Sequence, residues 1–378
     1  MIVLNWNGWE ETIECLESVF QNDYPDCYPI VVDNGSTDQS IEKIREFCNG
    51  KISSYSQYVH PKEHDRRVNL IEFYSGDLHN DSLDLHSDNQ SLILIKNREN
   101  LGYAGGNNIG ITYCLETLNP EFILLLNNDA VIPEHCIHDL VRYAEKNANI
   151  GMVQPTILFY DTQLIENSGY SLDIWGGAYP LKRYQAYGTM SDIISPGFFY
   201  ASGACLMVRS KILRELDDPG LDATFFLYYE DVDLSWRIRL IGYDIGICPD
   251  AICYHKEGNS CAKLKDKRFF YRNRNRIRLH LKNYSFFSLI LFLPQAVFLG
   301  FISACFCCMR ERTTVFLRLF LSSCTGNIKD IPLIMKKRGL IQNMREINDA
   351  GIISMMSVSP HHLDYYFMHR ESGEEGSS

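Results

Sequence analysis

Three carboxylates follow an aromatic run in the second half of the chain. Glu230, Asp231 and Asp233 come directly after residues 225–229, at the start of a segment with helical character. Like charges this close raise one another's pKa, and apolar neighbours raise it further. A carboxylate tuned in this way suits general-base catalysis. Acids at a helix N-terminus also interact well with the helix dipole, so helix capping explains the same residues equally well.

The composition indicates a sizeable core and one local concentration of positive charge. The chain has 378 residues, 46% hydrophobic and 22% charged, which suits one large catalytic domain with an appendage, or two domains. The formal net charge of -11 argues against a general nucleic-acid binder. Residues 263–282 are the exception, with nine Lys or Arg against one Asp.

The cysteines and the N-terminus bear on the compartment. The thirteen cysteines show neither zinc-site spacing nor a small disulfide framework, which favours reduced thiols in the cytosol. The first apolar run, residues 1–4, is too short for a signal peptide. We therefore expect a cytoplasmic protein.

Apolar strands alternate with helical patterns in the first half of the chain. Strands are predicted at residues 1–4, 29–32, 92–95 and 122–126, with more near 151–158, 202–208 and up to residue 255. Helices are expected near 13–20, 41–47, 109–117, 134–147 and 231–242. This alternation predicts an α/β fold with a parallel sheet. Residues 49–91 interrupt the rhythm, and we interpret them as a polar surface insertion with one short strand.

Polar clusters follow three of the predicted strands. They are residues 5–7 (Asn-Trp-Asn), 33–36 (Asp-Asn-Gly-Ser) and 127–129 (Asn-Asn-Asp). Ligands of parallel α/β sheets bind beyond the carboxyl ends of the strands, so these clusters are expected to share one edge. Each cluster taken alone is also ordinary turn chemistry.

Six stretches, in this order, resemble the inverting glycosyltransferases of family 2, and most closely the rhamnosyltransferase-like members. They are residues 2–8, 31–38 (VVDNGSTD), 100–110 (NLGYAGGNNIG), 124–133 (LLLNNDAVIP), 201–209 and 229–239. The resemblance covers residues 1–260 apart from the insertion. It implies the GT-A fold, a Rossmann-like mixed α/β sheet that binds a nucleotide-sugar.

The resemblance implies a donor site on these stretches. Asp33 at a strand tip can accept the imide N–H of uracil or thymine, as this position does in the family. Glycines without side chains allow backbone to approach a nucleotide-sugar, although a tight turn requires them equally. The implied donor-binding residues are Asn5, Asn7, Asp33, Asn34, Gly102, Gly105, Gly106, Asn107, Asn128 and Gly203.

The resemblance also implies a metal site and a base. Asp129 and His255 are the expected ligands of Mg²⁺ or Mn²⁺, cations that prefer oxygen ligands and neutralise a leaving diphosphate. Asn127 and Asn128 stand where the family has acids, so weak intrinsic affinity for the metal is expected. Asp231 is the implied base, with Glu230 and Asp233 adjusting its pKa and binding the acceptor. Trp236 is expected to pack rather than stack on a sugar.

An apolar run near the C-terminus suggests contact with a membrane. Residues 286–309 carry no charge and could span a bilayer by length. Basic residues on both flanks disfavour a single span, so we expect helices lying in the cytoplasmic face of a membrane. A buried pair of core helices is the alternative. Arginines at period two, residues 272–278, suit anionic lipid headgroups or a lipid diphosphate, or simply a solvated face.

These observations predict an inverting glycosyltransferase that uses a UDP- or dTDP-sugar and a glycan or polyprenyl-linked acceptor in cell-surface glycan synthesis. The expected division is a catalytic domain over 1–260, a basic linker over 261–283, a membrane-associated helical region over 284–340 and a tail over 341–378. The alternative is an inactive glycan-binding or scaffold protein on the same fold. A nucleotidyltransferase is disfavoured because residues 5–10 contain no Lys or Arg.

Overall fold

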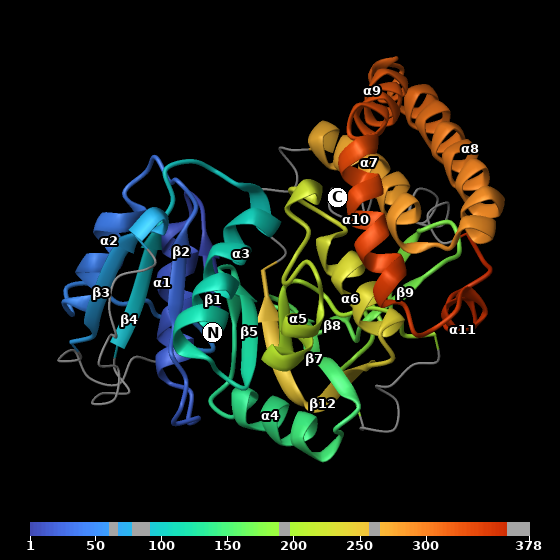
Figure 1. Ribbon diagram of the computed structural model, residues 1–378. Coiled ribbons are helices and arrows are strands. Elements are labelled where there is room, and N and C mark those ends of the chain that lie inside the picture. The colour runs from blue at the N-terminus through green and yellow to red at the C-terminus, as the bar shows by residue number, and fades with distance from the viewer. Residues whose placement is uncertain (60–66, 78–90, 189–196, 257–264, 361–378) are drawn as a thin grey trace.

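The computed structural model describes residues 1–59, 67–77, 91–188, 197–256 and 265–360. Four parallel strands form the first half of its main sheet, and Figure 1 shows them beside the N-terminus. They are β1 (Ile2–Asn5), β2 (Ile30–Asp33), β4 (Ser91–Lys96) and β5 (Phe122–Asn127). Their apolar sequences are almost entirely buried, which confirms the expected α/β core.

Antiparallel pairings make the complete sheet mixed. The further strands are β3 (Asn69–Tyr74), β6 (Ala130–Val131), β7 (Ile150–Phe159), β8 (Ile165–Asn167), β11 (Cys205–Arg209) and β12 (Asp244–His255). The order is β3-β4-β2-β1-β5-β11-β7-β12-β6, with β8 beside β7. β11 runs antiparallel to both β5 and β7. A separate small sheet joins β9 (Tyr170–Leu172) and β10 (Ala178–Pro180).

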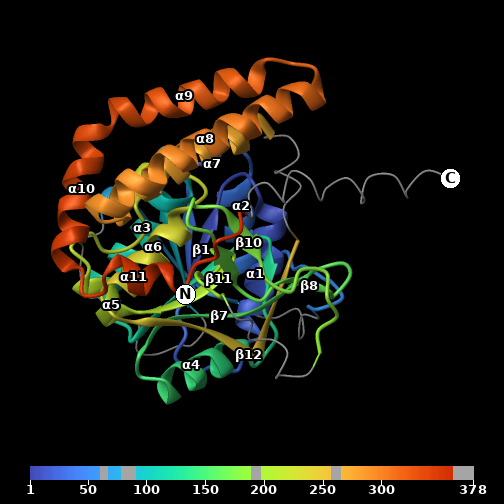
Figure 2. The same cartoon turned by 90° about the vertical axis from the view of Figure 1, so that its right-hand side faces the viewer.

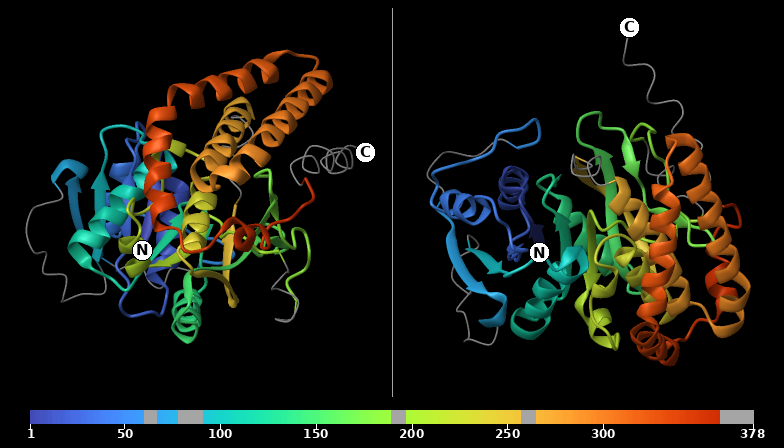
Figure 3. Two further views of the ribbon diagram at one scale, coloured as in Figure 1. Left: turned by 45° about the vertical axis from the view of Figure 1, so that its right-hand side comes forward. Right: turned by 90° about the horizontal axis from the view of Figure 1, so that it is seen from above.

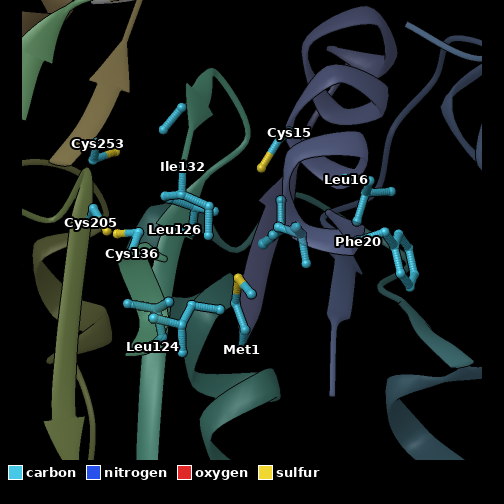
Figure 4. Packing of buried hydrophobic residues seen from close by; sticks show 14 of the residues in the cluster. Met1, Cys15, Leu16, Phe20, Leu124, Leu126, Ile132, Cys136, Cys205 and Cys253 are labelled. Carbon is cyan, nitrogen blue, oxygen red and sulfur yellow. The ribbon is translucent and has the colours of Figure 1, made fainter. Parts of the chain in front are cut away.

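Helices cover both faces of the sheet and close two apolar clusters. One cluster joins the strands to α1 (Trp9–Phe20), α2 (Ser40–Cys48) and α4 (Cys136–Lys146). Figure 4 shows part of it, with Cys136, Cys205 and Cys253 gathered at one place. The other cluster involves α3 (Gly102–Tyr113), α5 (Ser210–Glu215) and α6 (Glu230–Leu240). The twelve cysteines in the described part of the chain are all free thiols, as the sequence predicted.

One local prediction needs correction. The segment from Gly102 is not a turn that precedes a helix, because α3 begins at that residue and continues into a π-helical turn, Cys114–Leu118. The short strand predicted within the insertion 49–91 is present, since β3 pairs in parallel with β4 along its whole length. Residues 60–66 and 78–90 of the insertion lie outside the described residues.

The C-terminal part is helical and packs on the part of the molecule that contains the sheet. It contains α7 (Lys265–Asn283), α8 (Phe286–Glu311), α9 (Val315–Lys329), α10 (Ile331–Met344) and α11 (Asp349–Ile353). Figure 2 shows α8 and α9 side by side across the top of the molecule, and both views of Figure 3 agree. α7 lies beneath them, against α6.

The C-terminal helices contradict the predicted division into a linker over 261–283 and a tail over 341–378. α7 is not a linker, because Leu279 and Lys282 are buried between α6 and the later helices. Residues 341–357 are not a free tail, since Ile352 and Met356 share an apolar cluster with Trp236. The burial of Trp236 confirms its packing role. Apolar surface on α6 thus requires the C-terminal helices to cover it.

Candidate active site

The first two strand ends meet as the sequence predicted. Asn5 and Asp33 are partners in the β1–β2 register, and Asn5 Nδ2 donates to Asp33 Oδ1 at 2.8 Å. The backbone N–H of Ser36 donates to Asp33 Oδ2 at 3.1 Å. Asn7, at a positive φ of 53°, accepts from the backbone N–H of Thr37 at 2.8 Å. These bonds hold the two turns against each other at one edge of the sheet.

Asn34 has a positional role. Its amide donates to Asn100 Oδ1 and to the carbonyl oxygen of Gly102, both at 3.1 Å. Its Oδ1 accepts from Asn97 and from the backbone N–H of Leu101. All four bonds lie within the protein, so Asn34 ties β2 to the start of α3. Asn107 likewise donates to the carbonyl oxygen of Tyr103 in its own helix.

The glycines of α3 allow close packing. Gly102 has a φ of +76°, and a Cβ there would lie 2.5 Å from the carbonyl oxygen of Phe226. A Cβ on Gly106 would lie 2.5 Å from Leu4 of β1, and one on Gly105 would lie 2.9 Å from Leu101. Protein atoms thus occupy the space that the sequence prediction reserved for a nucleotide-sugar at these three positions. The glycines allow α3 to lie directly against β1 and against the loop that precedes α6, residues 224–229.

Asp231 is held by backbone N–H groups. Its Oδ2 accepts from the N–H of Gly203 at 3.0 Å, and its Oδ1 accepts from its neighbour Val232 at 2.8 Å. The hydroxyl of Tyr103 donates to the carbonyl oxygen of Gly203 at 2.6 Å. Burial raises the pKa of Asp231 above its usual value, although both N–H groups oppose the shift. Asp231 as a residue is only partly buried, in contrast to the buried acids beside it.

Glu230 and Asp233 are not available to bind an acceptor. Glu230 is buried, and its Oε2 has no hydrogen-bond partner among the described residues. Burial and the charge of Asp231 raise the pKa of Glu230 well above its usual value. Asp233 is fully buried and pairs with Arg237 at 2.9 Å and Lys282 at 2.8 Å. The expectation that these two acids bind the acceptor is therefore wrong, because the fold turns both inward.

The sheet register brings Asp129 and His255 together. Asp129 links β5 to β6, and His255 of β12 is the register partner of Ala130 in β6. His255 Nε2 lies 3.2 Å from Asp129 Oδ1, and His255 Nδ1 lies 2.7 Å from Glu166 Oε2. Burial opposes the charged imidazole, but Glu166 and Asp129 raise the pKa of His255 well above its usual value.

The residues present fit a divalent cation. The raised pKa favours the charged imidazole, which donates to both carboxylates, so a cation would have to displace the proton of Nε2. Nδ1–H would then remain on Glu166, the usual carboxylate–histidine–metal arrangement, and the lone pair of Nε2 would face the metal beside Asp129. Asp129 and His255 then supply one oxygen and one nitrogen ligand. No group of three His, Cys, Asp or Glu side chains suited to a metal occurs in the part of the chain that the structure describes. A cation here therefore needs further oxygen ligands, which a diphosphate provides.

The charges of both Asp231 and Asp129 act on one side chain, Tyr103. Burial raises the pKa of Tyr103 well above its usual value, and the charges of Glu230, Asp231 and Asp129 add to the shift. The backbone N–H of Asn127 donates to the carbonyl oxygen of Ala204, next to Gly203. Asn128 donates to Gly8 and to Thr12 of α1. Most of the predicted site residues therefore lie at the same edge of the sheet. Several of them bind other parts of the protein and stabilise its structure there.

Sequence reasoning missed Glu166 and Tyr103. Glu166 lies in a three-residue strand outside every recognised stretch, and only the β7–β8 pairing carries it to His255. Tyr103 lay within the matched stretch 100–110, where a hydroxyl among glycines was a usable signal. The predicted lipid-facing arginines were wrong in part, because Arg276 and Arg278 are buried.

The sequence comparisons define the class of protein. Residues 86–276 match the family model described as glycosyltransferase like family 2. Residues 1–72 match the model described as glycosyl transferase family 2. The first match alone covers half of the chain. The chain therefore belongs to glycosyltransferase family 2, and its mixed α/β sheet is the GT-A fold that the sequence predicted.

Particular relatives are distant. A low-salt glycan biosynthesis hexosyltransferase of Haloferax volcanii is 27% identical over 169 residues, 42% of this chain and 50% of the relative. A poly-β-1,6-N-acetyl-D-glucosamine synthase of Staphylococcus epidermidis is 21% identical over 249 residues, 66% of this chain and 47% of the relative. The chain thus spans about half the length of these curated relatives.

A solved structure is also similar. It is the mannosyltransferase of Pyrobaculum calidifontis in complex with GDP-Man and Mn²⁺, with a TM-score of 0.46 and 14% identity. The similarity covers 91% of this chain and 84% of that one. Because this score is below 0.5, family membership rests on the sequence matches.

Proposed function

We propose that this protein transfers a hexose from a UDP- or dTDP-sugar to a glycan or polyprenyl-linked acceptor, with inversion at the anomeric carbon. The observation that carries the proposal is the convergence of two groups at one edge of the sheet. One is Asp231, a partly exposed residue whose carboxyl has a raised pKa. The other is Asp129 with His255, backed by Glu166. A general base and a diphosphate-linked cation site are the two parts that glycosyl transfer by single displacement needs.

Asp231 is the base in this mechanism. Its carboxylate accepts the proton of an acceptor hydroxyl while that oxygen forms a bond to the anomeric carbon. The bond from the anomeric carbon to the diphosphate oxygen breaks, and the nucleoside diphosphate leaves on the opposite face. The N–H groups of Gly203 and Val232 orient the carboxylate. Burial keeps its pKa above that of an ordinary aspartate, which makes it a stronger base.

The donor binds at the carboxyl ends of β1, β2 and β5. Asp33 is as buried as Asp233, and its oxygens accept from Asn5 and from the N–H of Ser36. We therefore assign it to holding the two turns that border the base of the donor. Asp129 and His255 would hold a divalent cation, Mg²⁺ or Mn²⁺, together with the donor diphosphate. When bound, this cation neutralises charge on the leaving group. Glu166 keeps the tautomer of His255 that exposes Nε2.

The α8–α9 layer supports a membrane-bound acceptor. α8 has 26 residues, and an 18-residue stretch within it has a mean hydropathy of 2.2 with only 22% of that stretch buried. Its exposed large apolar side chains are Phe286, Phe287, Ile290, Leu291, Phe298, Phe301, Ile302 and Met309. Most of them are three, four or seven residues apart, which places them on one face of the helix. Arg312, Arg318 and Lys329 are exposed nearby. Because the other face packs on α7 and α9, we favour a helix lying in the cytoplasmic membrane surface over a span.

Binding to anionic vesicles tests the membrane contact. Phe287 is 83% exposed and Phe298 is 62% exposed. Replacing both by Asp is expected to lower partition into phosphatidylglycerol vesicles by about tenfold or more, because each buried Phe contributes about 1.5–3 kcal/mol. Tyr55→Asp, an exposed aromatic away from α8, is the matched control. Cosedimentation measures the effect, and equal binding of both variants would contradict a lipid-facing α8.

Release of nucleoside diphosphate tests the activity itself. The protein is incubated with a panel of nucleotide-sugars and Mn²⁺, Mg²⁺ or EDTA, with and without membrane extract as a source of acceptors. Metal-dependent release from one UDP- or dTDP-sugar supports the proposal and identifies the donor. Absence of release from every donor would instead favour a glycan-binding or scaffold role.

Replacing Glu230 by Gln tests whether the pKa of Glu230 is raised in the folded protein. The folded carboxyl of Glu230 keeps its proton to higher pH than the unfolded one, so stability falls as pH rises between the two pKa values. Glu230→Gln removes this loss, and we expect Tm to rise at pH 8 by about 2 °C, with a smaller rise at pH 5. Because burial, and not Glu230, raises the pKa of Asp231, the acid limb of kcat should stay at the same pH. Thermal scans and pH–rate profiles measure both, and a Tm gain independent of pH would contradict the assignment.

A further inference from the structure

We propose that Asn275 of α7 is a positioning residue for Asp231. This proposal rests on the function proposed above. Asn275 binds the aromatic loop, residues 224–229, which directly precedes α6. Asn275 is fully buried, so it acts through the loop and does not touch substrate. No earlier step of the mechanism uses α7, which the sequence marked only as a basic segment.

The aromatic loop has an unfavourable backbone conformation. Phe226, Tyr228 and Tyr229 have φ values of 65°, 67° and 74°. Residues other than glycine rarely adopt positive φ, and the surrounding structure must compensate for each such residue. Three of them occur within four positions, directly before Glu230 and Asp231. The loop therefore needs partners outside itself to keep this shape.

Asn275 supplies those partners with one amide group. Its Nδ2 lies 3.0 Å from the carbonyl oxygen of Phe225, 2.9 Å from that of Leu227 and 2.7 Å from that of Tyr228. Its Oδ1 accepts from Arg274 Nε at 2.9 Å, which orients the NH₂ group toward the loop. Three carbonyl oxygens share two hydrogens in a buried setting, where hydrogen bonds are strong and unpaired groups are costly.

Other residues of α7 hold the loop and α6 on either side of the base. Arg274 and Arg278 both donate to the carbonyl oxygen of Thr224, at 3.0 Å and 2.6 Å. Lys282 and Asn283 both donate to Asp233 Oδ1, at 2.8 Å and 3.0 Å. Asp231 thus lies between two segments that α7 fixes. The bond from the N–H of Gly203 to Asp231 then depends on the position that α7 sets.

The position of α7 is set in turn by α8 and α9. Arg276 donates to the carbonyl oxygen of Ala296 in α8 at 3.1 Å. Asn327 of α9 donates to the carbonyl oxygen of Arg274 at 2.8 Å and accepts from Arg278 Nε at 3.2 Å. The basic residues that the sequence suggested for lipid therefore serve the catalytic loop from inside the protein.

Asn275→Ala tests the role against a matched control, Asn273→Ala. Asn273 is a buried amide on the same helix, but it donates to Phe269 of its own helix at 2.9 Å. Asn275→Ala is expected to lower kcat of donor turnover by about 10- to 100-fold, because small misplacements of a reacting group cost this much. The KM for the donor should not change, since donor-binding residues lie on other elements. Asn273→Ala should retain wild-type kcat at a similar Tm.

Two further readouts separate positioning from loss of folding. Loss of the Gly203 N–H bond removes an interaction that lowers the pKa of Asp231, so the acid limb of kcat should move to higher pH in Asn275→Ala. Hydrogen exchange of the amides in 224–231 should accelerate in Asn275→Ala and remain slow in Asn273→Ala. If the alanine variant does not fold, Asn275→Ser, which keeps one donor, is measured in the same way with a smaller expected loss.

The outcomes distinguish this inference from the proposed function. Wild-type kcat, an unshifted acid limb or unchanged exchange in Asn275→Ala would overturn the positioning role and leave the enzyme assignment intact. Inactivity of the wild-type protein toward every donor would overturn the proposed function and the positioning role together. Loss of kcat and of protection in the Asn275 variant alone would support both.

Discussion

Asp231→Asn is expected to lower kcat by about 10²–10⁴-fold, the usual contribution of a positioned general base. The amide is isosteric with the carboxylate and can still accept from the N–H groups of Gly203 and Val232 through its oxygen. It cannot take the proton of the acceptor hydroxyl. Nucleotide binding should be unchanged, because Asp33 and Asp129 lie on other elements. Single-turnover kinetics and calorimetric titration with UDP measure the two quantities separately.

The pH dependence gives the same prediction a second test. Because burial raises the pKa of Asp231, the wild-type rate should fall with decreasing pH already above the range of an ordinary aspartate, about 3.9. This acid limb should be absent from the residual activity of Asp231→Asn. Asp217→Asn, a change at an exposed acid outside the site, serves as control. An acid limb that persists in the Asp231 variant would mean that another group is the base.

Loss of metal dependence is the second large effect expected. Asp129→Ala removes the carboxylate that we propose binds the metal and should lower turnover by about 10²-fold or more, since a metal clamp contributes several kcal/mol of charge stabilisation. Glu166→Gln keeps the geometry but removes the charge behind His255. It should raise the Mn²⁺ concentration for half-maximal rate by about 10- to 100-fold, as partners of ligating histidines commonly do.

Binding of Mn²⁺ itself supplies a readout independent of turnover. Electron paramagnetic resonance of Mn²⁺ in the presence of UDP should show weaker binding in the order wild type, Glu166→Gln, Asp129→Ala. Asp250→Ala, at an exposed carboxylate on β12, should bind as the wild type does. Equal affinity in all four proteins would exclude Asp129 and His255 as the metal ligands.

Much of the frame could be predicted from local patterns. The strands at 2–5, 30–33, 91–96 and 122–127 are short apolar runs that end in polar turns. Such continuous apolar runs are typical of parallel strands that are buried on both faces. The convergence of residues 5, 33 and 127–129 on one edge followed from that parallel arrangement. The roles of individual side chains were less predictable. Asn34 and Gly106 matched a donor motif, yet their contacts lie inside the protein.

What the sequence by itself determined is the family, the mixed sheet and the positions of Asp129, Asp231 and His255, because each follows from a short stretch read locally. Only the tertiary structure decided which acids stay partly exposed. Asp231 is partly exposed, whereas Glu230 and Asp233 are buried, since one turn of α6 points neighbouring side chains in different directions. It also decided the partners of distant origin, Glu166 behind His255 and Asn275 beneath the aromatic loop. Those contacts join segments about 90 and 50 residues apart, and chain topology rather than local pattern creates them.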